Sequence, residues 1–243
     1  MISGMRILLG VSGGIAAYKA VDVLRRLRDQ DAEVRVVMTR NATRFVTPLT
    51  FSALSGMPVL TDEFTEGAWG SMGHIAVTDG LDLALVVPAT ANIIGKMAAG
   101  IADDALSTSL MAAASPIIVA PAMNERMYRN AVLQRNIAGL RMVGIRFVEP
   151  ETGALACGTN GQGRLASPER IVQEVVLPFA EVPGRGQSPG DCGPDTGADR
   201  CSAVHQQSFD REDGVCSGSC GAGPWCRGIA RVRTDPATPS AGS

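Results

Sequence analysis

Residues 5–19 read MRILLGVSGGIAAYK, a stretch that predicts a strand, a glycine turn and the start of a helix. Residues 5–9 form an apolar run typical of a short buried strand, and the turn extends from Gly10 to Gly14. Apolar residues then recur at helical spacing through residues 16–28, while basic residues such as Lys19 are left to face water. A strand that enters a helix through a glycine turn is typical of the first unit of a doubly wound α/β fold.

The rest of the chain continues the alternation of strands and helices as far as about residue 180. Further buried strands are expected at residues 33–38, 81–87, 117–120 and 146–148. Helices are expected at residues 51–54, 92–99, 105–114, 131–140 and 168–177. This order predicts an α/β fold, a doubly wound (Rossmann-like, flavodoxin-type) parallel sheet with helices on both faces. Ligands bind beyond the carboxyl ends of such strands, so the loops there are the places to search for chemistry.

Composition divides the chain into two different kinds of sequence. Residues 1–180 hold one cysteine and one histidine, whereas residues 181–243 hold five cysteines and little periodic apolar pattern, so we expect one domain over 1–180 and a tail over 181–243. The net charge of -2 does not favour nucleic acid or an anionic membrane as a partner. The apolar runs are too short to cross a bilayer and the N-terminus lacks a signal-peptide cleavage pattern, so a cytoplasmic location is expected.

Polar side chains gather after the first strands of the predicted sheet. Ser12, Gly13 and Gly14 follow the first strand, Thr39 follows the second, and residues 90–92 (Thr-Ala-Asn) follow the strand at 81–87. Such loops favour a mononucleotide phosphate, which backbone N–H groups and hydroxyls would bind. Ordinary helix capping by the threonines explains the same residues equally well, and spacing leaves both interpretations open.

Three further residues are candidates for chemistry. Histidine is the side chain best suited to proton transfer near neutral pH, so His74 is a candidate base, although a lone loop histidine is more often a surface residue. Asn124 could bind a carboxylate or amide, or could open a helix over residues 125–129 through an Asx turn. Cys157 lies between glycines, a setting that exposes a thiol and so favours a reactive role over a structural one.

Five sequence motifs occur together in a recognisable order. They are residues 10–19, His74, residues 88–92 (PATAN) with 98–104 (AAGIADD), residues 121–127 (PAMNERM), and residues 153–164 (GALACGTNGQGR). Over residues 5–178 the chain resembles the homo-oligomeric flavin-containing cysteine decarboxylases. The resemblance is greatest to the phosphopantothenoylcysteine decarboxylases that form the N-terminal half of bifunctional coenzyme A biosynthesis enzymes. One departure is Tyr128, where the family usually has tryptophan.

The resemblance implies a reaction and a set of roles. FMN would oxidise the cysteine of 4'-phosphopantothenoylcysteine to a thioaldehyde, which accepts the electrons as CO2 departs. His74 would be the base, Asn124 with Met123 and Arg164 would bind the substrate, and Cys157 would help reduce the enethiol intermediate to 4'-phosphopantetheine. The implied flavin contacts are Ser12, Gly13, Gly14, Thr39, Thr90, Ala91 and Asn92. No metal is implied.

The resemblance also implies an oligomeric state and two alternative functions. Active sites in this family form between subunits, so a homotrimer or a higher assembly of trimers is expected. One alternative is an FMN-binding regulatory or non-catalytic subunit, and another is a peptidyl-cysteine oxidative decarboxylase. Members that stop before the reduction lack the cysteine, so Cys157 favours the coenzyme A pathway.

A shift of the reading frame explains the tail better than a zinc-binding module does. Its cysteine spacing fits no strong tetrahedral pattern. Back-translating residues 187–215 and reading one base downstream permits a sequence that resembles the start of the phosphopantothenate–cysteine ligase domain. We therefore predict a frameshift near residues 176–187, a disordered tail over 181–243 and no ligase activity.

Overall fold

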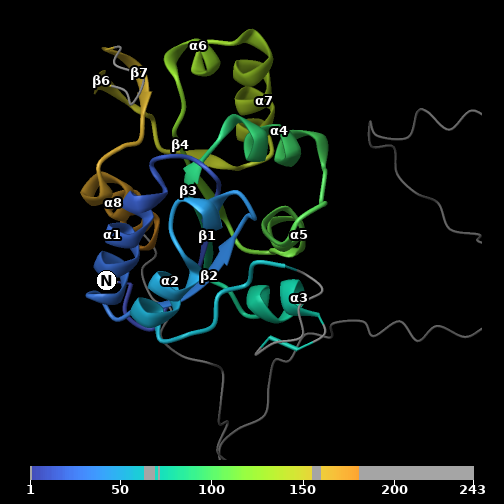
Figure 1. The fold of residues 1–243 in the computed structure, drawn as a ribbon, viewed down its shortest axis with the longest axis vertical. Coiled ribbons are helices and arrows are strands. Elements are labelled where there is room, and N and C mark those ends of the chain that lie inside the picture. The colour runs from blue at the N-terminus through green and yellow to red at the C-terminus, as the bar shows by residue number, and fades with distance from the viewer. Residues whose placement is uncertain (1, 63–68, 71, 155–159, 181–243) are drawn as a thin grey trace, which may run out of the picture. The chain divides into compact units, whose positions relative to one another are not determined.

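One parallel sheet of five strands organises the chain, in the order β2-β1-β3-β4-β5 (Figure 1). The structure is a computed structural model and describes residues 2–62, 69–70, 72–154 and 160–180. The strands are β1 (Arg6–Val11), β2 (Glu33–Met38), β3 (Leu83–Ala89), β4 (Ile117–Pro121) and β5 (Arg146–Phe147). This is the flavodoxin-type order, so the predicted fold class is confirmed.

Helices cover both faces of the sheet, because the central strands β1 and β3 carry buried apolar side chains on both faces. On one face lie α1 (Ala17–Arg28), α2 (Pro48–Ser55) and α8 (Pro168–Ala180). On the other lie α3 (Gly73–Thr78), α4 (Ala91–Ala99), α5 (Ala105–Ala112) and α7 (Ala131–Met142). Two short helical segments, η1 (Ala42–Arg44) and α6 (Glu125–Tyr128), follow β2 and β4.

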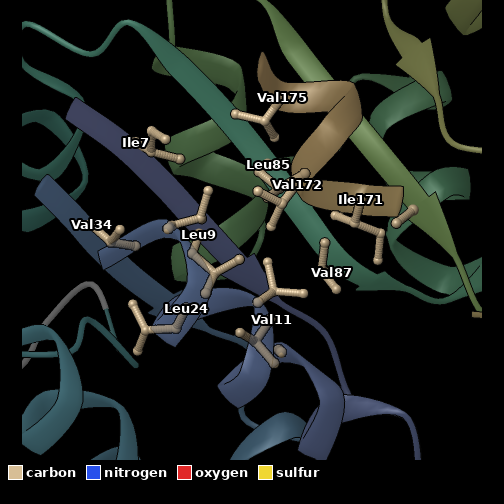
Figure 2. Packing of buried hydrophobic residues seen from close by; sticks show 14 of the residues in the cluster. Ile7, Leu9, Val11, Leu24, Val34, Leu85, Val87, Ile171, Val172 and Val175 are labelled. Atoms are coloured by element: carbon tan, nitrogen blue, oxygen red, sulfur yellow. The ribbon is translucent and has the colours of Figure 1, made fainter. Parts of the chain in front are cut away.

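Alternate strand residues supply two separate cores, as the period of a strand requires. Leu9 of β1 points to the face covered by α1 and α8, whereas the adjacent Leu8 points to the face covered by α4 and α5. Figure 2 shows the first core, where Ile171 and Val175 of α8 lie over the strands. The helix that ends the domain therefore packs against α1 and completes the core that the first strand and helix begin.

Two elements differ from the sequence-based expectation. β3 continues through Pro88 to Ala89, because a register shift between Val86 and Ala89 removes the need for a ladder N–H at the proline. Residues 151–164 were expected to form only a glycine-rich loop, but β6 (Glu151–Ala154) and β7 (Asn160–Arg164) pair as an antiparallel hairpin.

The predicted tail over 181–243 lies outside the described residues, so its disorder and the frameshift stay predictions. Within the described part of the chain, no helix combines the length and apolar character needed to cross a membrane.

Candidate functional site

A cavity of about 630 Å³ opens beyond the carboxyl ends of β1, β3 and β4. In this strand order the chain reverses its direction across the sheet between β1 and β3, and the loops that diverge there leave a crevice. The volume is in the range of cofactor and small-molecule sites. The segment after β1 lines it with Gly14, Ile15, Ala16, Tyr18 and Lys19, and the start of α4 lines it with Thr90 and Ala91. The remaining lining residues are Ala122, Met123, Asn124, Met127, Gly163, Arg164 and Leu165.

Ser12 joins the two loops that flank this crevice. Its buried hydroxyl donates to the carbonyl of Pro88 at 2.7 Å and accepts from the N–H of Thr90 at 3.0 Å. Position 13 needs a glycine because the chain packs closely there: a Cβ would overlap the backbone and Cβ of Asn41. Ser12 and Gly13 thus hold the cavity wall in place from behind, and their predicted contact with flavin stays a prediction.

Two helices begin at the cavity, and only α4 has an open N-terminus there. In α1 the N–H groups of Ala17 and Lys19 already donate to the carbonyls of Gly14 and Ala16, at 2.9 Å and 3.0 Å. Ala16 is the N-cap residue of α1 and Thr90 is that of α4. Among the described residues, no side chain caps either helix start. Helix starts carry unpaired N–H groups and partial positive charge, which suits an anionic group of a ligand. The capping interpretation of Thr90 therefore has no support in its side-chain hydrogen bonds.

Thr39 and Asn92 are close to the site in sequence order but do not line the cavity. The Thr39 hydroxyl accepts a hydrogen bond from the N–H of Ala42 at 3.2 Å, so it stabilises the turn into η1, although the N-cap residue of η1 is Asn41 rather than Thr39. Asn92 is exposed in the first turn of α4. Their flavin contacts, like that of Ala91, are predictions that the structure alone does not test.

Asn124 lies at the cavity and also starts a helix. Its Oδ1 accepts from the N–H of Arg126 at 2.8 Å, which is the Asx turn that opens α6. Met123, one residue earlier, lines the cavity and donates its N–H to the carbonyl of Gly163 at 2.9 Å. The two interpretations of Asn124 are thus compatible, because the turn fixes the side chain where it faces the cavity.

The β6–β7 hairpin closes one side of the cavity through close backbone contact with this asparagine segment. Gly163 has φ +135°, and a Cβ there would overlap the carbonyl oxygen of Met123. A Cβ at Gly161 would similarly overlap the carboxylate of Glu125. The glycines of the motif therefore let β7 approach α6. Cys157 belongs to residues 155–159 between the two strands, which lie outside the described residues.

His74 is placed apart from the cavity that its own chain forms. It lies in the first turn of α3, beside Gly73, whose Cα faces the side chain of Leu60. Arg35 donates from its guanidinium to the carbonyl of Asp79 at 2.8 Å and so fixes the other end of this helix against β2. The His74 Nδ1 is buried and has no hydrogen-bond partner among the described residues.

Lys19 lines the cavity, contrary to the expectation that it faces water. It is the third residue of α1, where a cation is disfavoured by the helix dipole. Burial, followed by the nearby charge of Arg164, lowers the pKa of its ammonium group below the ordinary value. An unfavourable charge in a first helical turn was the sequence signal that could have revealed this residue.

Tyr128 anchors α6 on the side away from the cavity. The ring is only 7% exposed, and its hydroxyl donates to Glu149 Oε2 at 3.0 Å. Arg141 of α7 forms an ion pair with the same carboxylate. Burial, followed by the hydrogen bond and charge of Glu149, raises the pKa of Tyr128 to about 12. The phenol thus couples the helix after Asn124 to the segment after β5.

This fold and cavity define a class: flavodoxin-like α/β proteins that bind a ligand with an anionic group at the β1/β3 switch point. Comparison with known proteins gives the family. The flavoprotein family model matches residues 1–179, and the chain belongs to this family.

Curated relatives include the coenzyme A biosynthesis bifunctional protein CoaBC of Bacillus subtilis, 50% identical over 181 residues. The CoaBC of Escherichia coli K12 is 45% identical over 181 residues. Each alignment covers 74% of this chain and 45% of the relative, so the matched part spans about half the length of these proteins.

Solved structures with the same fold include a cysteine-to-serine variant of PPC decarboxylase complexed with pantothenoylaminoethenethiol. It is 30% identical, with TM-score 0.65, and the match covers 73% of this chain and 100% of that one. The FMN binding protein AtHal3 is 31% identical, with TM-score 0.65, over 74% of this chain and 99% of that one. These findings confirm the resemblance expected from the motifs.

Proposed function

We propose that this chain binds FMN and decarboxylates 4'-phosphopantothenoylcysteine to 4'-phosphopantetheine. The observation that carries the proposal is the meeting of Asn124, the end of β7 and the starts of α1 and α4 at one cavity. Two kinds of relative support the pathway and the reaction: CoaBC proteins act in coenzyme A biosynthesis, and a PPC decarboxylase shares the fold.

The cavity fits a flavin mononucleotide in charge and in surface character. The uncapped start of α4 offers N–H groups to a phosphate. Ile15, Met127 and Leu165 supply apolar surface for a planar ring system. FMN, when bound, supplies a reversible two-electron acceptor for the substrate's cysteine.

The chain's own residues would position the substrate and move protons. Asn124 lines the cavity with an amide whose orientation is fixed by the Asx turn, so it can hold the substrate carboxylate or amide. Met123 and Arg164 line the same space and would contact the rest of the substrate. His74 would act as the base, and Cys157 would supply a proton in the reductive step.

The position of His74 favours a site completed by a second copy of the chain. In the described residues, His74 does not line the cavity of its own subunit. Two large apolar residues close to it in sequence are exposed: Met72 is 65% exposed and Ile75 is 48% exposed. Such a patch is suited to self-association. A trimer would place His74 of one subunit at the cavity of the next.

Mixing two inactive variants tests this arrangement. His74→Asn and Asn124→Asp proteins should each bind flavin but release no CO2 from 4'-phosphopantothenoylcysteine. Co-folding equal amounts should restore about a quarter of wild-type activity, because about one site in four then receives both native residues. The absence of any recovery in verified mixed oligomers would contradict a shared site. Absence of CO2 release from flavin-loaded wild-type oligomers would refute the catalytic proposal itself.

A flavin-binding subunit without turnover is the second candidate function. It is favoured by the similarity to AtHal3, whose structure is described as that of an FMN binding protein. An oxidised-flavin spectrum is expected for both functions, so only CO2 release separates them. A Cys157→Ser variant adds a further distinction, since an accumulating oxidised aminoenethiol product is expected only from the decarboxylase.

A further inference from the structure

Lys19 and Arg164 bring two positive charges to the same cavity from different elements. Lys19 is in the first turn of α1, and Arg164 is the last residue of β7. Neither makes an ion pair with any carboxylate in the described part of the chain. The two cations are therefore held close together without a direct counter-ion from these residues.

The two nearest carboxylates are already engaged by other groups. Glu151 and Glu169 raise the pKa of Lys19, which places both within electrostatic reach. However, Glu151 Oε1 accepts from the N–H of Ser167 at 2.9 Å, and Glu169 forms an ion pair with Arg26. Their charge moderates the repulsion between the cations, but one oxygen of each carboxylate is bonded to another group.

The arrangement is unfavourable until an anion enters. A cation in a first helical turn opposes the helix dipole, and a second cation beside it adds repulsion. One carboxylate would balance only part of this charge, whereas a phosphate monoester carries nearly two negative charges and three acceptor oxygens. A guanidinium and an ammonium are the side chains that bind such a group.

We propose that Lys19 and Arg164 form a subsite for the phosphate monoester of a bound small molecule, with Lys19 as a specificity-determining residue. The inference rests on the proposed function, which offers two sources of this chemistry: the phosphate of FMN and the 4'-phosphate of the substrate. Arg164 was expected to bind substrate, and Lys19 is the residue that the structure adds.

Two ratios measured on Lys19→Met and Arg164→Gln proteins test the subsite. The first is the affinity for FMN relative to riboflavin, measured by fluorescence quenching without turnover. The second is kcat/KM for phosphopantothenoylcysteine relative to pantothenoylcysteine. We expect one of the two ratios to fall by about 10- to 100-fold, the loss expected for one charge-assisted hydrogen bond. Lys19→Arg should restore part of the loss, because it restores the charge.

Arg25→Met is the matched control. Arg25 is exposed near the other end of the same helix, so its loss changes net charge equally but should leave both ratios unchanged. A fall in the first ratio alone identifies the flavin phosphate as the ligand, and a fall in the second identifies the substrate phosphate. If both ratios stay within twofold of wild type in both cavity variants, the subsite is refuted. Wild-type protein that turns over neither substrate would refute the proposed function, while the flavin ratio still tests the subsite.

Discussion

Replacing Tyr128 by phenylalanine removes one oxygen atom from the contact that anchors α6. The lost hydrogen bond joins the phenol to Glu149 Oε2 at 3.0 Å. A hydrogen bond to a charged group contributes about 1.5–3 kcal/mol when both partners are buried. The Glu149 side chain is 46% exposed, so water can replace the phenol at the carboxylate. We therefore expect Tyr128→Phe to lower the free energy of unfolding by about 1 kcal/mol at neutral pH.

The pH dependence gives this prediction its sign. The pKa of Tyr128 in the folded protein is raised to about 12 from 10.0. A group with a raised pKa stabilises the fold at pH values below its unfolded pKa, and this stabilisation is lost as pH rises through the folded pKa. At neutral and mildly alkaline pH, where Glu149 is ionised, the difference between wild type and variant should thus be constant, and it should shrink between about pH 10 and 12.

Chemical denaturation at a fixed protein concentration measures the free energy, and a matched control is available. The chain has two tyrosines, and Tyr18 is 61% exposed at the cavity. Tyr18→Phe should leave stability nearly unchanged, and phenolate absorbance in that variant reports Tyr128 alone. Equal unfolding free energies for wild type and Tyr128→Phe, or a phenolate transition near pH 10 in Tyr18→Phe, would refute the anchor.

Three other changes have defined outcomes. Gly163→Ala should lower stability by about 1–3 kcal/mol, because the new methyl group overlaps the Met123 carbonyl in a strained backbone conformation, and thermal unfolding with flavin titration would show it. Gly95→Ala, in the middle of α4 with no atom near the new Cβ, should instead raise stability by about 0.5–1 kcal/mol, and a loss there would contradict the reasoning. Asp104→Ala removes the capping box of α5 and an ion pair of Lys96, so a loss of about 0.5–2 kcal/mol is expected by denaturation at pH 7. Burial alone would raise the pKa of Asp104, but hydrogen bonds from Lys96 and the Ser107 N–H lower it below 3.8, so this contribution should disappear only as pH falls below about 4.

Much of the fold could be predicted because the strands are apolar on both sides. Val86 and Val87 of β3 point to opposite cores, which is why the strand reads as an unbroken apolar run. The carboxyl ends of such strands then indicated the correct loops for Gly14, Thr90 and Asn124. Local sequence was sufficient at these places, since the backbone order alone determines where the loops meet.

The hairpin and Lys19 were missed because non-local contacts determine them. Residues 151–164 lack the alternation of a strand, and the hairpin is held by contacts of Gly161 and Gly163 with the asparagine segment. Lys19 has the helical position of a surface residue, and its charge in a first helical turn is the one local sign that it lies at a cavity, because distant segments such as β7 supply the other walls. The role of Ser12 was also missed in part. Its hydroxyl donates to the carbonyl of Pro88, 76 residues away, and the sequence of the glycine turn does not indicate this partner.

The packing of α8 against α1 also has a consequence for synthesis of the chain. Ile171, Val172 and Val175 complete the core that contains Leu9, Val11 and Leu24 (Figure 2). During translation, the apolar faces of β1 and α1 are synthesised more than 140 residues before the helix that covers them. At ordinary rates of synthesis this interval lasts on the order of ten seconds, during which those faces are available to chaperones or to other nascent chains. A ribosome that stalls before α8 would therefore leave the apolar surface of β1 and α1 exposed. Loss of this helix should cause aggregation during synthesis.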